Sequence, residues 1–343
     1  MHTPPTPEFT ARIDELVKVT TRVREALASV VVTAPEVPRL TVAVLLAGGH
    51  LLIEDVPGVG KTTLANALAR SIHSTMGRVQ FTPDLLPSDL TGVSIYQNQT
   101  GEFIFRPGPV FNSIVIGDEI NRASPKTQSA LLECMEEHQV TVDGESYPLP
   151  EPFLVVATQN PVELEGTYPL PEAQRDRFMA RLAIGYPDAA GEMVMLDRLE
   201  SASPLDALEP VTTGAAVLEM QRLVPQVFAS DAVKEYVLRL VTATREHSAT
   251  QLGASPRASL QLLRAAKALA AMEGRTQVSA ADVQELAVPV LAHRLILTGQ
   301  ARITGTSAAD LMAEIVADTP LPAETAVAGE TAVAPNAALT VDH

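Results

Sequence analysis

The first residues with an evident chemical use form a glycine-rich segment that ends in Lys61 and Thr62. An apolar run precedes it and a helical pattern follows, so the sequence predicts a strand, a tight loop and a helix. Gly58 and Gly60 would let backbone N–H groups converge on a β-phosphate at the helix N-terminus. Lys61 would reach the β- and γ-phosphates, and Thr62 would offer its hydroxyl to Mg²⁺. The predicted nucleotide site is lined by Asp55, Pro57, Gly58, Val59, Gly60, Lys61, Thr62 and Thr63.

A pair of carboxylates, Asp118 and Glu119, ends a second apolar run and is suited to hydrolysis of the bound nucleotide. Asp118 would hold a water molecule on Mg²⁺, and Glu119 would polarise the attacking water. The interval from Lys61 to Asp118 leaves room for another strand between the two motif strands, as in glutamate-dependent P-loop ATPases. Glu119 counts against a P-loop kinase, and the lack of an N-K-x-D motif weighs against a GTPase.

Asn160 ends the next apolar run, residues 153–160. If this run is the strand beside the one that carries Asp118, the Asn160 amide could hydrogen-bond the γ-phosphate or the attacking water. The other interpretation, an asparagine that simply begins a loop before Pro161, remains open from the residues alone.

The elements that must position these groups alternate between strands and helices from residue 50 to residue 184. The apolar runs are continuous, as expected for parallel strands covered on both faces. They occupy residues 50–54, 78–81, 113–119, 153–160 and 179–185. Five such runs with intervening helical patterns predict a doubly wound α/β sheet.

Two segments interrupt this alternation. Residues 93–107 read as a small β excursion that turns at residues 99–101, and residues 138–150 read as a hairpin. In that hairpin, Asp143 and Gly144 suit a type I′ turn. The sequence therefore predicts two β insertions in the α/β core.

The remaining segments are predicted to be helical or disordered. Proline and glycine residues separate five helical patterns after Pro187, followed by a short helix at residues 307–317. The last residues repeat ETAVA without an apolar period, which is typical of disorder. We predict N-terminal helices in 1–48, an α/β core in 49–186, a helical domain in 187–317 and a disordered tail in 318–343.

Composition narrows the class of partner. The chain has 25 Lys and Arg against 41 Asp and Glu, a formal charge of −16, which disfavours binding to nucleic acid or to anionic membranes. The first residues lack an apolar signal sequence, and the most apolar run is too short to span a bilayer. Cys134 is the only cysteine, so no internal disulfide is available. These features favour a cytoplasmic protein without membrane insertion.

The motifs, taken in order, resemble the MoxR family of AAA+ ATPases. The stretches that match are GHLLIEDVPGVGKTTLA, FTPDLLPSDLTG, FIFRPGPVF, DEINRASPKTQSALLECMEE, VATQNPVELEGTYPLPEAQRDRF and GASPRA, between residues 49 and 257. Asp55, where the strict phosphate-loop pattern has glycine, looks like the variant of this family. The resemblance implies an AAA+ core, a helix-2 insert at residues 93–107, a pre-sensor-1 hairpin at residues 138–150 and a helical lid.

The resemblance also implies roles for three polar residues. Asn160 matches sensor 1, Arg257 matches the sensor 2 arginine of the lid, and Arg177 matches the arginine finger that reaches the γ-phosphate of a neighbouring subunit. Arg175 stands where the family has an apolar residue and could serve in place of Arg177. A finger that acts between subunits implies ATP hydrolysis in a ring, expected to be a hexamer.

MoxR proteins resemble chaperones in that they remodel client proteins, often with a partner that carries a von Willebrand factor A domain, during maturation or metal-cofactor insertion. We expect that function here. The alternatives are the AAA+ subunit of a metal chelatase and a nucleotide-binding scaffold without turnover. A DNA translocase is disfavoured because residues 93–105 and 138–150 contain neither Lys nor Arg.

Overall fold

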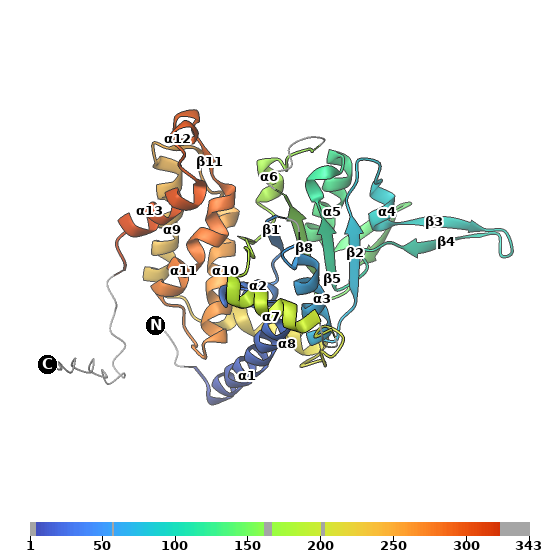
Figure 1. Cartoon of the computed structure of the whole chain (residues 1–343), viewed down its shortest axis with the longest axis horizontal. Helices are drawn as coiled ribbons and strands as arrows, with labels where there is room; N and C mark the ends of the chain where they lie inside the picture. The colour runs from blue at the N-terminus through green and yellow to red at the C-terminus, as the bar shows by residue number, and fades with distance from the viewer. Residues whose placement is uncertain (1–4, 57, 161–166, 200–202, 323–343) are drawn as a thin grey trace, which may run out of the picture.

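The computed structural model describes residues 5–56, 58–160, 167–199 and 203–322. Figure 1 shows an α/β part on the right and C-terminal helices on the left, with α1 and α2 beneath their junction. Pro57 lies outside the described residues, as does most of the predicted disordered tail.

Five parallel strands form the central sheet in the order β2-β5-β8-β1-β9. They are β1 (Leu51–Glu54), β2 (Met76–Gln80), β5 (Ile114–Asp118), β8 (Leu154–Gln159) and β9 (Ala180–Leu182). Each overlaps one of the five apolar runs, so the predicted sheet is confirmed. Because β5 and β8 lie between β1 and β2, the loop after β1 comes close to the carboxyl ends of β8 and β5.

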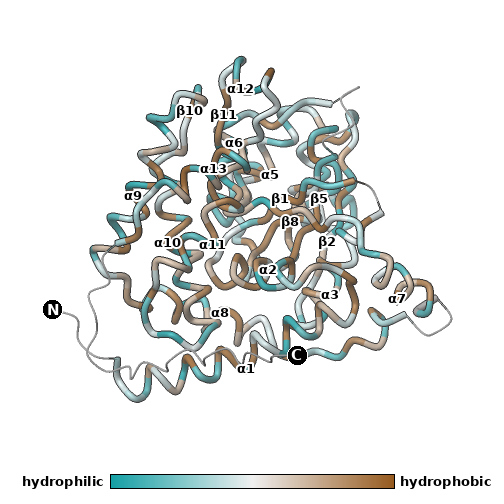
Figure 2. Tube along the Cα trace, turned by 60° about the vertical axis from the view of Figure 1, so that its left-hand side comes forward, coloured by the Kyte–Doolittle hydropathy of each residue, from teal (hydrophilic) through white to brown (hydrophobic). Residues whose placement is uncertain are grey.

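Alternate residues of the strands enter two separate apolar clusters. In β1, Leu51 and Ile53 join the cluster that includes α1 (Pro7–Val30), α2 (Glu36–Leu46) and α3 (Lys61–Ser71). Leu52, between them, joins the cluster formed with α5 (Pro125–Glu137). Both faces of the sheet are therefore covered, which explains the continuous apolar runs. The hydrophobic stretches of β1, β5 and β8 lie together in the interior (Figure 2).

The two N-terminal helices join the α/β part to the C-terminal helices. Helix α1 packs against both α3 and α10 (Pro256–Met272), and α2 packs against α10 and α8 (Gly214–Leu223). Their apolar residues belong to one cluster that runs from the sheet into the C-terminal helices. The domain boundaries at residues 48 and 186 stay a prediction, since packing is continuous across both.

The C-terminal region is helical, as predicted. The helices are α7 (Ala189–Leu199), α8, α9 (Asp231–Glu246), α10, α11 (Ala280–Leu291), α12 (Gly299–Ile303) and α13 (Ala308–Asp318). The structure adds a short antiparallel pair, β10 (Thr250–Leu252) with β11 (Ile296–Leu297). Strands of two and three residues are too short to show a period in the sequence, so the helical pattern alone did not indicate them.

Both predicted β insertions are present. Strand β3 (Gly92–Gln97) pairs with β4 (Glu102–Pro107), and β6 (Gln139–Val142) pairs with β7 (Glu145–Pro148). Figure 1 shows the β3–β4 hairpin extending away from the body, beyond the short helix α4 (Pro87–Thr91). Asp143 and Gly144 both have positive φ, 52° and 84°, as the predicted type I′ turn requires.

A buried ion pair fastens the C-terminal helices to the segment between α6 (Glu172–Arg175) and β9. The Arg294 side chain is 2% exposed, and its Nε donates to Asp176 Oδ1 at 2.8 Å. Arg294 also donates to the backbone carbonyl of Phe178 at 2.6 Å. Ser255, just before α10, donates to Asp176 Oδ2 at 2.9 Å. Asp176 thus accepts bonds from two separate parts of the C-terminal region.

Within the described ranges, the helices are too short or too polar to cross a membrane.

Replacing Arg294 by methionine tests this fastening. The Asp176 carboxylate would remain largely buried without its cation, so the free energy of unfolding should fall by about 3–5 kcal/mol. Urea unfolding followed by circular dichroism measures the loss. The matched change Arg302→Met, on the exposed side of α12, should cost less than about 0.5 kcal/mol. Equal losses in both variants would contradict a special role for the buried pair.

His50 gives the fold a predictable pH dependence. Burial lowers the pKa of His50 to about 4, and its neutral ring accepts from the Val155 N–H and donates to the Met135 carbonyl. The unfolded chain binds a proton near pH 6.5 that the folded chain refuses until about pH 4, so stability is full above pH 6.5 and falls as the pH drops through this window. The expected loss is about 3 kcal/mol.

The variant His50→Gln keeps one acceptor and one donor but does not titrate. Its free energy of unfolding, measured by urea titration at several pH values between 4 and 6.5, should therefore change less steeply with pH than that of the wild type. Identical slopes would show that His50 does not carry this pH dependence.

Candidate functional site

The predicted phosphate loop connects the carboxyl end of β1 to the first residue of α3. Gly58 and Gly60 have φ values of 89° and 94°, a region that side chains other than glycine rarely adopt. Helix α3 begins at Lys61, so Thr62 and Thr63 lie in its first turn. The loop thus presents backbone N–H groups at the N-terminus of an eleven-residue helix, the arrangement that binds phosphate.

Lys61 is held at the centre of this loop. Its ammonium donates to the backbone carbonyls of Asp55 and Val56 at 2.7 and 3.1 Å. Partial burial lowers the pKa of Lys61, while the charges of Asp55, Asp118 and Glu119 oppose the shift. Only β8 separates β1 from β5 in the sheet, so the two carboxylates that end β5 stand at the same edge as the loop that follows β1. The structure therefore brings the two predicted motifs together.

The Asp55 side chain binds backbone groups on both sides of the phosphate loop. Its carboxylate is buried: Oδ1 accepts from the Val56 N–H at 2.8 Å, and Oδ2 accepts from the N–H groups of Ile184 and Gly185 at 2.6 and 2.7 Å. These bonds occupy the side chain with the segment after β9. We therefore assign the Asp55 side chain to positioning of the loop rather than to contact with the nucleotide. Pro57 lies outside the described residues.

Asp118 ends β5 and Glu119 follows it, and both carboxylates accept hydrogen bonds from residues of β2 that lie outside the two sequence motifs. Asp118 Oδ2 accepts from Arg78 Nε at 2.8 Å. Glu119 has the left-handed φ of 58°, and its Oε2 accepts from Gln80 Nε2 at 3.0 Å. Its N–H donates to the Thr158 hydroxyl at 3.0 Å. The backbone turn and the side-chain bond together fix the direction of the Glu119 carboxylate.

One feature of the sequence pointed to Arg78 and Gln80, the residues of β2 that bind Asp118 and Glu119. In the run of residues 78–81, Arg78 and Gln80 alternate with apolar residues, which indicates a strand with one face partly exposed. Only the register identifies what they contact, because β2 pairs with β5 so that Gln80 lies opposite Asp118. Arg122, which ion-pairs with Glu119 at 3.2 Å, lies in the short 3₁₀ turn after β5 and had no signal.

Asn160 directly follows β8, which lies between β1 and β5 in the sheet. It therefore stands at the same edge as the phosphate loop and the two carboxylates. The preceding residue, Gln159, donates to Glu54, and Glu54 pairs with Arg181 at 2.6 Å. A row of polar side chains thus joins the carboxyl ends of β8, β1 and β9. The placement agrees with the predicted sensor position.

The residues at this edge suit a magnesium ion. Mg²⁺ prefers hard oxygen ligands, and the Thr62 hydroxyl and the Asp118 carboxylate supply two of that kind. Asp118 Oδ1 is only weakly occupied, by the Thr158 hydroxyl at 3.4 Å, while Oδ2 is paired with Arg78. An oxygen of Asp118 therefore remains available to a metal or to its bound water.

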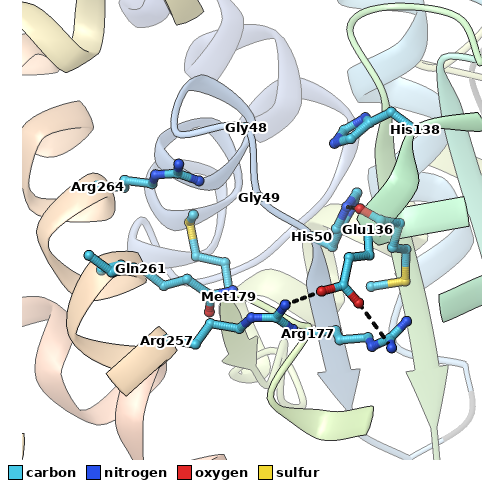
Figure 3. A pocket seen from close by; sticks show the side chains of 12 residues that line it. Gly48, Gly49, His50, Glu136, His138, Arg177, Met179, Arg257, Gln261 and Arg264 are labelled. Atoms are coloured by element: carbon cyan, nitrogen blue, oxygen red, sulfur yellow. Dashed lines mark hydrogen bonds and ion pairs between the residues drawn. The ribbon is translucent and has the colours of Figure 1, made fainter. Parts of the chain in front are cut away.

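Arg177 and Arg257 form a second group, at the other end of β1. They line a cavity of about 300 Å³ together with Gly48, Gly49 and His50, which precede β1, whereas the phosphate loop follows it. Both arginines bind one carboxylate, Glu136 near the end of α5: Arg177 at 2.9 Å and Arg257 through a short contact (Figure 3). The hydrogen bond from Arg257, with the charge of Arg177, lowers the pKa of Glu136.

Within one chain, Arg257 lies away from the phosphate loop, and its sensor 2 role stays a prediction. The four residues of β1 separate the cavity from the phosphate loop, a span of about 13 Å at strand spacing. The helix α10 that carries Arg257 is fastened by Ser255 to Asp176, at the amino end of β9. The fold thus groups Arg257 with Arg177 rather than with Lys61.

Arg175 differs from Arg177 in its contacts. Arg177 also donates to the Leu132 carbonyl at 2.5 Å and is therefore held from two sides. The Nε atom of Arg175 is buried and has no hydrogen-bond partner among the described residues. Its charge contributes to the strongly lowered pKa of His293, whose largest cause is burial. Arg175 ends α6 and Arg177 follows two residues later, so both arginines lie before the amino end of β9.

Comparisons with known proteins match this arrangement. Residues 50–180 match the sequence model of the ATPase family associated with various cellular activities (AAA), and residues 242–315 match that of the AAA lid domain. A crystal structure of a proposed ATPase from Cytophaga hutchinsonii superposes with a TM-score of 0.85 at 39% identity, covering 91% of this chain and 97% of that one.

Three relatives agree along most of their length. The uncharacterised protein YeaC of Bacillus subtilis is 50% identical over 88% of this chain and 94% of its own. Chaperone MoxR1 of Mycobacterium tuberculosis is 43% identical over 81% of this chain and 76% of its own. Protein MoxR of Paracoccus denitrificans is 34% identical over 80% and 87%. With the sheet order, the loop and the lid already described, these matches show that the chain belongs to the MoxR family of AAA+ ATPases.

Proposed function

We propose that this protein hydrolyses ATP at an interface between two copies of the chain in a ring and uses the energy to remodel client proteins. The observation that carries the proposal is the division of charged groups between the two ends of β1. Lys61 and the carboxylates lie at the carboxyl end, and two arginines lie at the amino end. A nucleotide bound at one end therefore meets the arginines only when another copy supplies them.

In the proposed reaction, the loop N–H groups and Lys61 bind the β- and γ-phosphates. Thr62 and Asp118 would hold Mg²⁺, which neutralises negative charge on the phosphates when bound. Glu119 accepts a proton from the attacking water, and its bond to Gln80 keeps the carboxylate aimed. Asn160 orients the water or the γ-phosphate from the end of β8.

The arginines complete the site across the interface. Arg177 stabilises the charge that develops on the γ-phosphate of the neighbour, and Arg257, on the same face, assists it. In the single chain, Glu136 binds both cations. Assembly would exchange this carboxylate for phosphate oxygens, so turnover depends on the ring, which we expect to be a hexamer.

Remodelling of proteins is supported by the relative named a chaperone, which favours it over the chelatase and scaffold alternatives. The partner with a von Willebrand factor A domain, the maturation of client enzymes and a cytoplasmic location belong to the proposal through the family resemblance. The acidic charge of −16 supports a protein client over a nucleic acid.

Glu119→Gln tests the assigned base. The amide cannot accept the proton of water, so ATP turnover should fall by about 10²–10⁴-fold, whereas ATP binding measured by a fluorescent analogue should persist. The exposed change Glu235→Gln on α9 serves as the control and should keep full turnover. Unchanged phosphate release by the Glu119 variant would contradict the role of Glu119 as the general base. Purification of the ATP-loaded variant should also recover bound client and partner proteins.

A mixing experiment tests catalysis across the interface. Lys61→Ala and Arg177→Ala should each abolish turnover, the second by about 10³–10⁵-fold. Mixed in equal amounts, they form interfaces with an intact loop from one copy and an intact arginine from the other, so about a quarter of wild-type activity should return.

Lys61→Ala mixed with Glu119→Gln is the matched control, because both changes damage the same side of the interface and the mixture should stay inactive. Arg257→Ala and Arg175→Ala can replace Arg177→Ala to assign each arginine. Failure of every arginine variant to regain activity in a mixture would contradict a site shared between copies.

A further inference from the structure

A cleft of about 360 Å³ is lined by residues of the two inserted hairpins. It shares no lining residue with the cavity that contains Arg177 and Arg257. Strand β3 of the first hairpin contacts β6 of the second. Aromatic and acidic side chains line the cleft, among them Phe103, Phe105, Tyr147, Asp143 and Glu145. We call this feature the hairpin cleft.

Aromatic rings form one wall of the hairpin cleft. In the β3–β4 register, Tyr96 lies opposite Phe103 and Ser94 opposite Phe105, so these side chains share one face of the ribbon. Phe105 stacks on Tyr147 of the second hairpin, with ring centroids 4.1 Å apart. Phe103 is 73% exposed and Tyr96 is 52% exposed. Large apolar side chains gathered on a projecting ribbon mark an interaction surface.

Negative charge forms the other wall. Asp143 and Glu145 flank the turn of the second hairpin, and neither has an ion-pair partner among the described residues. The Tyr147 hydroxyl donates to Glu145 at 2.8 Å. This bond raises the pKa of the Tyr147 hydroxyl, and burial and the charges of Glu145 and Asp143 raise it further. The carboxylates therefore lie beside ring faces without a cation to neutralise them.

We propose that the hairpin cleft binds a client polypeptide segment in which a lysine or arginine stands next to apolar residues. The cation would lie against the Phe105–Tyr147 rings and the two carboxylates, where cation–π attraction and opposite charge act together. The apolar neighbours would cover Phe103 and Tyr96. The inference deepens the proposed remodelling function by naming the chemistry of the client segment.

Charge complementarity selects this occupant. Nucleic acid and anionic membranes would place phosphates against Asp143 and Glu145, which repels them. A second copy of this chain carries the same charge of −16, so two copies repel each other on average, which favours a partner of opposite charge at this acidic site. A basic and apolar segment of another protein satisfies both walls of the hairpin cleft.

Peptide binding by the full chain tests the proposal. Three fluorescein-labelled peptides share an apolar sequence and carry lysine, glutamate or serine at two central positions. Fluorescence anisotropy should show the lysine peptide binding about tenfold more tightly than the other two. The affinity for the lysine peptide should also fall as the salt concentration is raised, because exposed charges are screened.

Two cleft variants localise the binding. Asp143→Asn with Glu145→Gln removes the charge and keeps a residue that tolerates the left-handed φ at position 143. Phe103→Ser removes an exposed ring. Each variant should lower the affinity for the lysine peptide about tenfold. Circular dichroism and ATP turnover without peptide should match the wild type, which establishes that the variants fold. The matched control Glu235→Gln with Glu246→Gln, on the exposed face of α9, should bind as the wild type does.

Two results would overturn the proposal: equal binding of the lysine and glutamate peptides, or unchanged binding in both cleft variants. A cleft variant that alters sedimentation of the assembled chain would instead make the hairpin cleft a contact between copies, which also overturns it. Loss of peptide binding with intact ATP turnover rejects only the hairpin cleft. Absence of ATP turnover with intact peptide binding rejects only the proposed hydrolysis.

Discussion

Burial of both faces of the parallel sheet is the constraint on which the rest of the structure depends. With apolar clusters on each side, the polar groups of the central strands β1, β5 and β8 gather at the strand ends. The carboxyl ends therefore gather the phosphate loop, Asp118, Glu119 and Asn160, although long stretches of chain separate them. The amino ends gather Arg177 and, through the lid, Arg257. The chemistry of the protein is divided by the direction of its strands.

The division at the sheet becomes a property of the whole chain through α5 and the lid. Helix α5 begins just after the turn that carries Glu119 and Arg122, and in its last turn Glu136 binds the two arginines. It is followed directly by the hairpin β6–β7. One helix thus connects the proposed base, the proposed interface cations and the hairpin cleft.

The lid is fastened to the core at Asp176, next to the proposed arginine finger and away from the phosphate loop. Arg294 and Ser255 both bind Asp176, the residue before Arg177. Within one chain, the lid is therefore bonded to the residue that precedes the proposed finger, Arg177. In a ring, the lid of one protomer would influence the nucleotide of its neighbour, which agrees with a site shared between copies.

The sequence by itself determined the local elements and the residues of the two phosphate-binding motifs. Five continuous apolar runs, the glycines of the loop and the Asp143–Gly144 turn have local physical causes, namely burial, positive φ and hairpin twist. The helical lid was also predictable, because proline and glycine residues separate its helical patterns.

Tertiary structure decided the partners of those residues. Asp55 binds backbone N–H groups after β9, and Gln80 binds Glu119 across a strand pairing, so both contacts depend on strand order and register. Arg257 joins Arg177 because the lid packs at the amino ends of the strands, a choice made by the apolar cluster shared by α1, α2 and α10. Such contacts join distant segments, and no local propensity encodes them. The glycine-rich loop before Lys61 could therefore be predicted from its letters, whereas the site around it required the fold.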